Sequence, residues 1–264
     1  MFALFASCSG ESAGAADSAA QEVRDLIVAL TPPALTEIPV VKSEAFATRK
    51  RTLERLRQAD AAVGLEALRV YQEAPPKLPE VRAGLLDVAA HTAPKACEEL
   101  LVQLVITFGE DLTVRRAATE FLGACLPERA LVELEPILHG KYDDRTLPPE
   151  ERILAAWIQA TEILKKDPVP LLAEIGTDIH RPQEVRHLAA KTLGRFPSPQ
   201  GRQALELLLV ESTGNGYIRR LALQSLLESL PKDEFCKLAK ATQDREADTA
   251  FIVFLQDALD KNCR

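Results

Sequence analysis

The sequence contains few aromatic residues: they make up 5% of its 264 residues and include a single tryptophan. It has no run of 18 apolar residues, the length that a membrane-spanning helix requires. It also has no excess of basic residues, because its formal net charge is −7. These absences argue against a transmembrane helix and against nonspecific binding to nucleic acid, which needs a concentrated basic surface. Few aromatic residues also favour stacked helices over a β-sandwich.

The usual catalytic and metal-binding motifs are absent too. The sequence has no Gly-x-Ser-x-Gly, no phosphate-binding loop, no Gly-x-Gly-x-x-Gly and no Cys-x-x-Cys. No histidine is followed by glutamate, so the metal-binding His-Glu pairs of deoxyhypusine hydroxylases are missing; the four histidines are His91, His139, His180 and His187. We therefore predict no catalytic residue, no metal ligand and no cofactor, and we expect that the protein is not an enzyme.

A phrase built around Val-Arg recurs at a nearly fixed interval. Its arginines are spaced by 33, 37, 34 and 33 residues; they are Arg82, Arg115, Arg152, Arg186 and Arg219. Around each arginine, apolar residues gather at offsets −1, +2, +3, +6 and +7, which form one stripe of an α-helix. A proline follows each of these helices and introduces a second apolar helix. A period of this length predicts stacked helix pairs rather than one globular core.

The repeated phrase resembles the HEAT-repeat family. The pattern Val-Arg-x-x-Ala-Ala-x-x-Leu-Gly is clearest at residues 114–123 and 185–194, and the resemblance covers residues 43–262. It implies an all-α fold, a right-handed α-α superhelix of the HEAT-like, armadillo-like kind with about six helix pairs. We interpret the arginines as structural, with stems packed between repeats and guanidinium groups capping carbonyl or acidic groups.

The sequence predicts three segments. Residues 1–20 are expected to form a flexible tether, residues 21–42 a short helix with a Pro-rich connector, and residues 43–264 the repeat domain. The apolar residues before Cys8 resemble the end of a bacterial lipoprotein signal, which makes Cys8 a candidate lipidation site. The protein would then be lipid-anchored in the bacterial cell envelope or periplasm. The alternative is a disordered N-terminus on a cytoplasmic protein.

The other four cysteines fall into two pairs at equivalent places in the repeat. Cys97 and Cys236 begin a helix that follows a Val-Arg helix, whereas Cys125 and Cys263 end the next helix along. One hypothesis is two disulfides, Cys97–Cys125 and Cys236–Cys263, which would indicate an oxidising compartment. The alternative is four buried thiols that act as small apolar side chains.

One repeat departs from the regular spacing. The step of 37 residues lengthens a loop that carries Tyr142, Asp143 and Asp144, and Trp157 follows at a position that is polar in the other copies. Tyrosine and tryptophan are enriched at interaction hot spots, so these four residues are a candidate partner-binding patch. The alternative is that Trp157 packs beneath the longer loop.

These patterns predict a non-enzymatic scaffold that binds a protein or peptide along a groove. We expect the groove to follow the helices that come after each Val-Arg helix. Those helices are rich in glutamate, so a basic partner is favoured, and nucleic acid is not expected to bind. The alternative is an enzyme-associated module that resembles the bilin lyases, which would have a pocket with converging polar groups.

Overall fold

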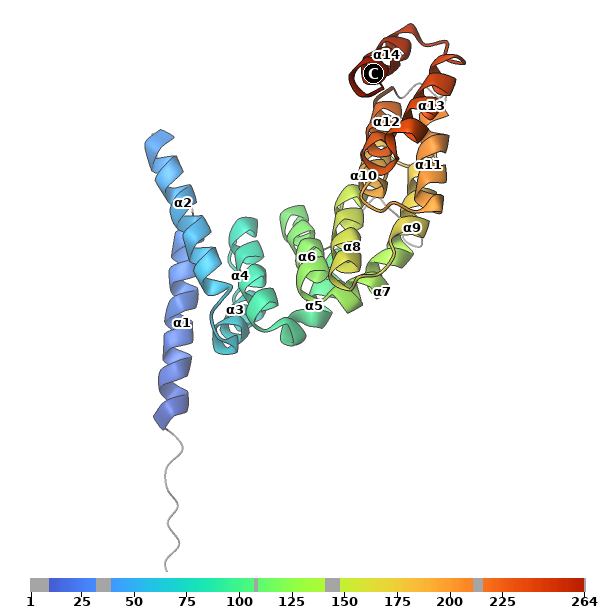
Figure 1. The fold of residues 1–264 in the computed structure, drawn as a ribbon. Helices are drawn as coiled ribbons and strands as arrows, with labels where there is room; N and C mark the ends of the chain where they lie inside the picture. The colour runs from blue at the N-terminus through green and yellow to red at the C-terminus, as the bar shows by residue number, and fades with distance from the viewer. Residues whose placement is uncertain (1–9, 32–38, 107–108, 141–147, 211–215, 264) are drawn as a thin grey trace, which may run out of the picture. The chain divides into compact units, whose positions relative to one another are not determined.

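The computed structural model describes residues 10–31, 39–106, 109–140, 148–210 and 216–263 (Figure 1). Within these ranges the chain forms fourteen α-helices and no β-strand. The all-α, HEAT-like helical-repeat class predicted from the sequence is therefore confirmed.

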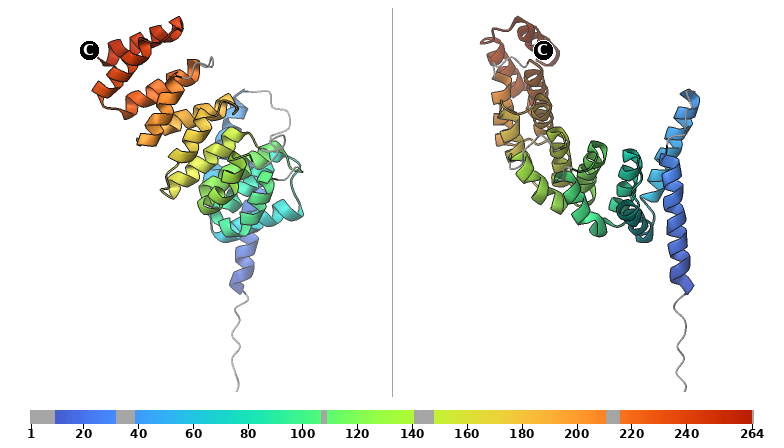
Figure 2. Two further views of the ribbon diagram at one scale, coloured as in Figure 1. Left: turned by 90° about the vertical axis from the view of Figure 1, so that its right-hand side faces the viewer. Right: turned by 180° about the vertical axis from the view of Figure 1, so that it is seen from behind.

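The chain divides into two compact units, residues 1–164 and 165–264. Unit 1 contains α1 (Gly10–Leu30), α2 (Pro39–Leu56), α3 (Ala61–Glu73), α4 (Pro79–Thr92), α5 (Pro94–Ile106), α6 (Leu112–Cys125), α7 (Pro127–Leu138) and α8 (Glu150–Ile163). Unit 2 contains α9 (Val169–Thr177), α10 (Gln183–Leu193), α11 (Pro199–Val210), α12 (Gly216–Ser229), α13 (Lys232–Gln243) and α14 (Thr249–Asn262). The left view of Figure 2 shows the helix pairs of unit 2 following one another, from yellow to red.

Each Val-Arg helix packs more extensively against the helix that precedes it than against the helix that follows it, and α14 completes the series by packing on α13. The pairs are α3–α4, α5–α6 and α7–α8 in unit 1, and α9–α10, α11–α12 and α13–α14 in unit 2. The structure therefore contains the predicted six helix pairs. The repeat pattern of the sequence predicted that each Val-Arg helix pairs with the helix that follows it, whereas in the structure it pairs with the helix that precedes it. The reason is that the proline after a Val-Arg helix opens the next pair, as Pro94 does for α5 and Pro127 for α7.

Val-Arg helices also form a layer of their own within unit 1, where α4 contacts α6 and α6 contacts α8 (Figure 1). Gly123 makes the second contact close, because a Cβ atom at this position would lie 2.5 Å from the main-chain oxygen of Ala156. In unit 2, a Cβ on Gly194 would likewise lie 2.7 Å from the Cβ of Ser225. The glycine of the repeated Leu-Gly therefore sets how closely successive pairs can stack.

The repeated arginine caps the carbonyl end of the preceding helix. Arg115 is 5% exposed and donates from Nε to the oxygen of Leu104 (3.2 Å) and from Nη2 to that of Val105 (2.9 Å), both near the end of α5. In unit 2, Nε of Arg186 donates to Gly176 (3.0 Å). These carbonyls have no acceptor role inside their own helix, so the arginine completes the hydrogen bonding of each turn. The predicted structural role is confirmed for these copies.

Two arginines of the series also bind a glutamate just before the second helix of the next pair. Nη2 of Arg82 lies 2.7 Å from Oε1 of Glu110, and Arg219 pairs with Glu246 while its Nε donates to the oxygen of Leu209. These ion pairs join one helix pair to the next. The interpretation of the guanidinium groups as caps for acidic groups is therefore confirmed as well.

Arg152 does not follow the pattern. It is exposed and forms an ion pair with the exposed Glu120 on α6, at 3.3 Å. The two residues after it, Ile153 and Leu154, are fully buried instead. Arg152 was therefore wrongly aligned with the other arginines, because α8 places an apolar pair where the other copies have Val-Arg.

The N-terminal segment differs from its predicted role as a tether. Helix α1 begins at Gly10 and packs on α3 and α4, with Ala19, Val23 and Leu26 buried. Leu30 lies over Gly84 of α4, where a Cβ atom would come within 2.1 Å of its Cδ1. Residues 39–42, expected to be an extended connector, begin α2. Because alanine-rich sequence looks flexible without its packing surface, the burial of α1 could not be read from composition. Cys8 lies outside the described residues.

Arg115→Met should lower the free energy of unfolding by about 2 to 3 kcal/mol, because two buried carbonyl groups lose a charged donor. Arg152→Met is the matched control and should cost about 0.5 kcal/mol or less, since its ion pair is exposed. Urea unfolding followed by circular dichroism measures both. Equal losses in the two variants would contradict the capping role.

Candidate functional site

Trp157, the centre of the predicted partner-binding patch, is a core residue. Its side chain is 4% exposed, and its Nε1 donates to Oε2 of Glu135 on α7 at 3.4 Å. The prediction that Trp157 presents its indole to a partner is therefore wrong, and its packing within the α7–α8 pair explains the apolar residue at a usually polar position. Tyr142, Asp143 and Asp144 lie outside the described residues.

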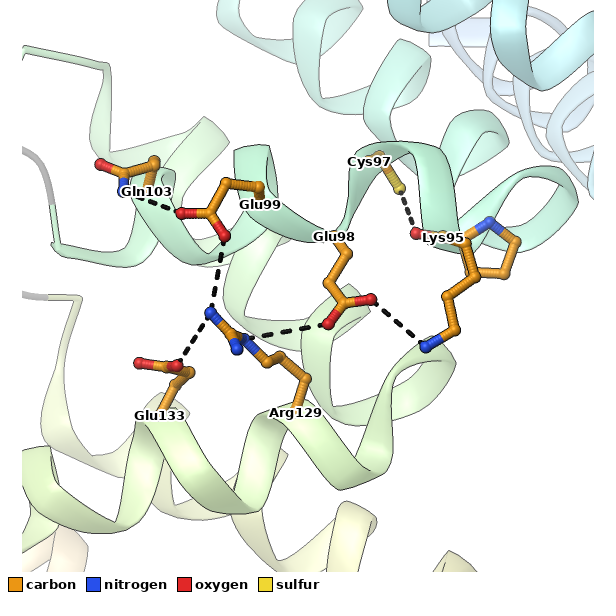
Figure 3. A network of polar contacts seen from close by, with 8 residues as sticks. Lys95, Cys97, Glu98, Glu99, Gln103, Arg129 and Glu133 are labelled. Carbon is orange, nitrogen blue, oxygen red and sulfur yellow. Dashed lines mark hydrogen bonds and ion pairs between the residues drawn. The ribbon is translucent and has the colours of Figure 1, made fainter.

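A network of charged side chains joins the first turns of α5 and α7 instead (Figure 3). Arg129 of α7 reaches three carboxylates: its Nη2 lies 3.1 Å from Glu133 and 3.5 Å from Glu99, and its Nε lies 3.9 Å from Glu98. Lys95 adds a contact of 3.3 Å to Glu98. Several of the glutamates that were expected to bind a basic partner thus form ion pairs with Arg129 and Lys95.

A cavity of about 430 Å³ adjoins this network. It is lined by the turns at which one helix pair of unit 1 gives way to the next: Pro94, Lys95, Glu98, Cys125, Leu126, Pro127, Glu128, Arg129, Val132 and Leu164. Its walls combine apolar side chains, charged groups and one thiol. A hollow of this volume with few polar groups is typical of sites for a small molecule or an anchoring side chain.

An imidazole and a guanidinium group hold a buried carboxylate, that of Asp87 on α4. Nδ1 of His91 lies 2.8 Å from the main-chain oxygen and 3.0 Å from Oδ1 of Asp87, one turn earlier on α4. Arg57 donates two short hydrogen bonds to the carboxylate of Asp87, from Nε to Oδ1 at 2.9 Å and from Nη2 to Oδ2 at 2.7 Å.

The charged groups of Arg57, Asp87 and His91 stabilise one another. Burial alone would raise the pKa of Asp87, but hydrogen bonds from His91 and Arg57 outweigh it and hold that pKa below its usual value. The hydrogen bond to Asp87 is the main cause that raises the pKa of His91 to about 10. His91 therefore carries its proton at neutral pH.

The four cysteines that follow Cys8 in the sequence are in two different states. Cys236 and Cys263 form a disulfide with a Cα–Cα distance of 5.7 Å, as the sequence suggested for this pair. Cys97 and Cys125 are free thiols, so the disulfide suggested between them is not present. Cys97 is fully buried, and burial raises the pKa of its thiol to about 11.

Sequence reasoning missed this group of residues, because the histidines were considered only for metal-binding motifs. One signal was available, since Asp87 and His91 are four residues apart on a helix and so share a face. Arg57 is 30 residues away from Asp87, and only packing brings the two together.

No group of three or more His, Cys, Asp or Glu side chains that could hold a metal ion occurs in the described part of the chain. Of the helices described, none is long and apolar enough to cross a membrane.

No protein-family model matches the sequence, and no curated protein matches it. Among solved structures, human deoxyhypusine hydroxylase in complex with glycerol is similar over 92% of this chain and 96% of its own chain, with 17% sequence identity and a TM-score of 0.37. At this level the match transfers neither residues nor a reaction.

The similar protein is an enzyme. This contradicts the prediction that the present chain is not an enzyme, which depended on missing motifs. Absent motifs exclude only the chemistries that they encode. We therefore withdraw that prediction.

The burial of Trp157 can be tested through its fluorescence, since it is the single tryptophan of the chain. Acrylamide should quench the native protein weakly and the urea-unfolded protein strongly, because the native indole is shielded from solvent. Strong quenching of the native protein would restore the exposed-patch interpretation.

The free energy of unfolding should depend on pH through His91. Its folded pKa of about 10 exceeds the ordinary 6.5, so its contribution is complete below pH 6.5 and is lost as pH rises through 10. The stability advantage of the wild type over His91→Gln should therefore shrink across this window. Urea unfolding at several pH values measures it.

The matching NMR titration of His91 provides the control. Asp87→Asn should move the pKa of His91 down toward 6.5, because the charged partner is lost. A wild-type pKa already near 6.5 would contradict the proposed connection to Asp87.

Proposed function

We propose that this protein is a helical-repeat binding protein that holds a basic segment of a protein or peptide partner at the cavity of unit 1. The observation that carries the proposal is the combination of an apolar hollow with an acidic rim, at the turns between consecutive helix pairs. The site replaces the groove expected from the sequence, which ran along whole helices.

The apolar part of the cavity can receive one anchoring side chain. Leu126 is buried in its wall, whereas Val132 is 64% exposed and adds an accessible apolar surface to the lining. Hot spots of interfaces are usually such pockets, in which one apolar anchor of the partner is desolvated. A leucine- or methionine-sized side chain matches the available volume.

The rim supplies the preference for positive charge. Three carboxylates surround Lys95 and Arg129, those of Glu98, Glu99 and Glu133 (Figure 3). A fourth, Glu128, lines the cavity. Glu128 is exposed and forms no ion pair with another described residue. Lysine or arginine side chains that flank the anchor would meet this excess of negative charge, which mainly increases the association rate and the specificity.

One observation favours a second candidate, the enzyme-associated module of the sequence-based alternative. That alternative predicts converging polar groups, and Cys125, Glu98 and Arg129 do converge on the cavity. Binding and chemistry would then use the same hollow.

An array of synthetic peptides with an apolar centre and variable lysine and arginine content tests the binding proposal. The protein should prefer basic peptides, and Val132→Asp should weaken the best of them by about tenfold or more, equivalent to about 1.4 kcal/mol. Fluorescence anisotropy measures the affinities.

Val253→Asp is the matched control, because Val253 on α14 is 69% exposed and lines none of the cavities described. It should bind like the wild type. Glu128→Lys should weaken basic peptides and spare neutral ones. No preference for basic peptides, or equal binding by Val132→Asp and Val253→Asp, would overturn the proposal.

A further inference from the structure

We propose that a second cavity, in unit 2, is a binding site for an amphiphilic carboxylate, a small molecule that joins one carboxylate group to an aliphatic chain. The cavity measures about 490 Å³ and lies where the pair α11–α12 meets α13 and the turn before α14. It shares no lining residue with the cavity of unit 1. The inference therefore goes beyond the proposed function, and each can fail without the other.

Apolar side chains form one part of the wall. Val210 ends α11 and is 60% exposed, Leu238 and Ala241 come from α13, and Ala247 comes from the turn before α14. A hollow of this volume with few polar groups is typical of small-molecule sites. An aliphatic chain laid against these side chains would remove apolar surface from water on both sides, which favours binding.

A buried arginine forms the floor of the polar part. Arg219 of α12 is 8% exposed; its Nε donates to the main-chain oxygen of Leu209 at 2.9 Å, and its Nη2 pairs with Glu246. Its Cζ lies 3.9 Å from the ring centroid of Phe251 on α14. These contacts fix the guanidinium group in the wall, and its Nη1 has no acceptor among the residues that the structure describes.

The one carboxylate among the lining residues is fully engaged. Oε1 of Glu246 accepts from the main-chain N–H groups of Ala247 (3.0 Å) and Asp248 (2.9 Å), and Oε2 pairs with Arg219. The hydrogen bond from Arg219 is the main cause that holds the pKa of Glu246 below its usual value. Glu246 thus balances Arg219 and orders the turn, and it leaves no negative charge for another cation.

Arg245 is the cation that remains. It lines the cavity, is exposed, and forms no ion pair with another described residue. The neighbouring Asp244 does not balance it, because Asp244 pairs with Lys240 at 3.3 Å. Two guanidinium groups and one carboxylate in the wall leave one excess positive charge, which matches a ligand with one negative charge.

The chemistry of arginine favours a carboxylate as the head group of that ligand. A guanidinium group presents its N–H donors as a planar fork that matches the two oxygens of a carboxylate. The apolar wall beside Arg245 then receives the chain that follows the head group. The cavity of unit 1 has an acidic rim, so it would repel the same molecule.

The test uses the full chain and sodium octanoate below its micelle concentration, with isothermal titration calorimetry. We expect saturable binding of one octanoate per chain. Arg245→Gln should weaken it by about tenfold or more, because a charged hydrogen-bond donor to the head group is lost. Lys237→Gln is the matched control, since Lys237 is an exposed cation of α13 that does not line the cavity, and it should bind like the wild type.

Ala241→Glu tests the cavity without removing a cation. Ala241 is exposed on α13, and glutamate is a good helix former, so the fold should tolerate the change. The new carboxylate would occupy the wall and repel the head group, so octanoate should again bind about tenfold more weakly or worse. Circular dichroism must show that each variant is folded.

Analogues of the ligand separate its two parts. Octanol lacks the charge and acetate lacks the chain, so each should bind at least about tenfold more weakly than octanoate. A leucine-terminated hexapeptide with a free carboxylate should also bind more weakly. Tighter binding of that peptide would overturn the proposal by identifying a protein terminus as the ligand.

Three further results would overturn it: no saturable binding of octanoate, equal binding of octanol, or equal losses in Arg245→Gln and Lys237→Gln. Val132→Asp, which alters the cavity of unit 1, should leave octanoate binding unchanged. A loss of octanoate binding in Val132→Asp would place the ligand in the other cavity and would also contradict the proposal.

Discussion

The guanidinium group that caps the end of the preceding helix is the interaction on which the rest of the structure depends. A helix cannot turn back on itself without leaving its last carbonyl groups unpaired, and in a stacked array these ends are buried. Arg115 and Arg186 solve this at each turn with a side chain that is long enough to reach the carbonyl and always charged. The cap fixes which helix pairs with which, and so it also fixes where the turns between pairs lie. Both the cavity and the thiol are located at those turns.

Close packing of the Val-Arg helices is the second constraint, and it explains why polar side chains from different repeats interact in unit 1. Gly123 lets α8 approach α6, and the small residues of α4 give α1 and α6 room to pack. Helices this close bring side chains of different repeats within hydrogen-bonding reach. Asp87 is 3% exposed in such a place, and a buried carboxylate requires partners. It has them in Arg57 and His91, and the proton that His91 retains is a consequence of that requirement.

The repeat class, the number of helix pairs and the role of the arginines could be predicted, because all three depend on periodic local patterns. The phase of the pairing could not, since proline ends one helix and begins another equally well. The burial of α1 was missed because alanine-rich sequence carries no sign of the surface that it meets. For Trp157 the sequence left an exposed and a packed position open, because its place in the repeat does not show which neighbours cover it. The ion pair of Arg57 with Asp87 joins residues 30 positions apart, and local patterns contain no information about such contacts.

The ion pair between Arg82 and Glu110 spans two successive repeats, since Arg82 lies on α4 and Glu110 comes just before α6. Repeat arrays bend by small rotations between neighbouring pairs, while each helix keeps its own hydrogen bonds. A rotation between α4 and α6 would therefore change the separation of the guanidinium group and the carboxylate without unfolding a helix. The local curvature of unit 1 sets whether the two groups touch, and a partner that bends the array would have to stretch this ion pair.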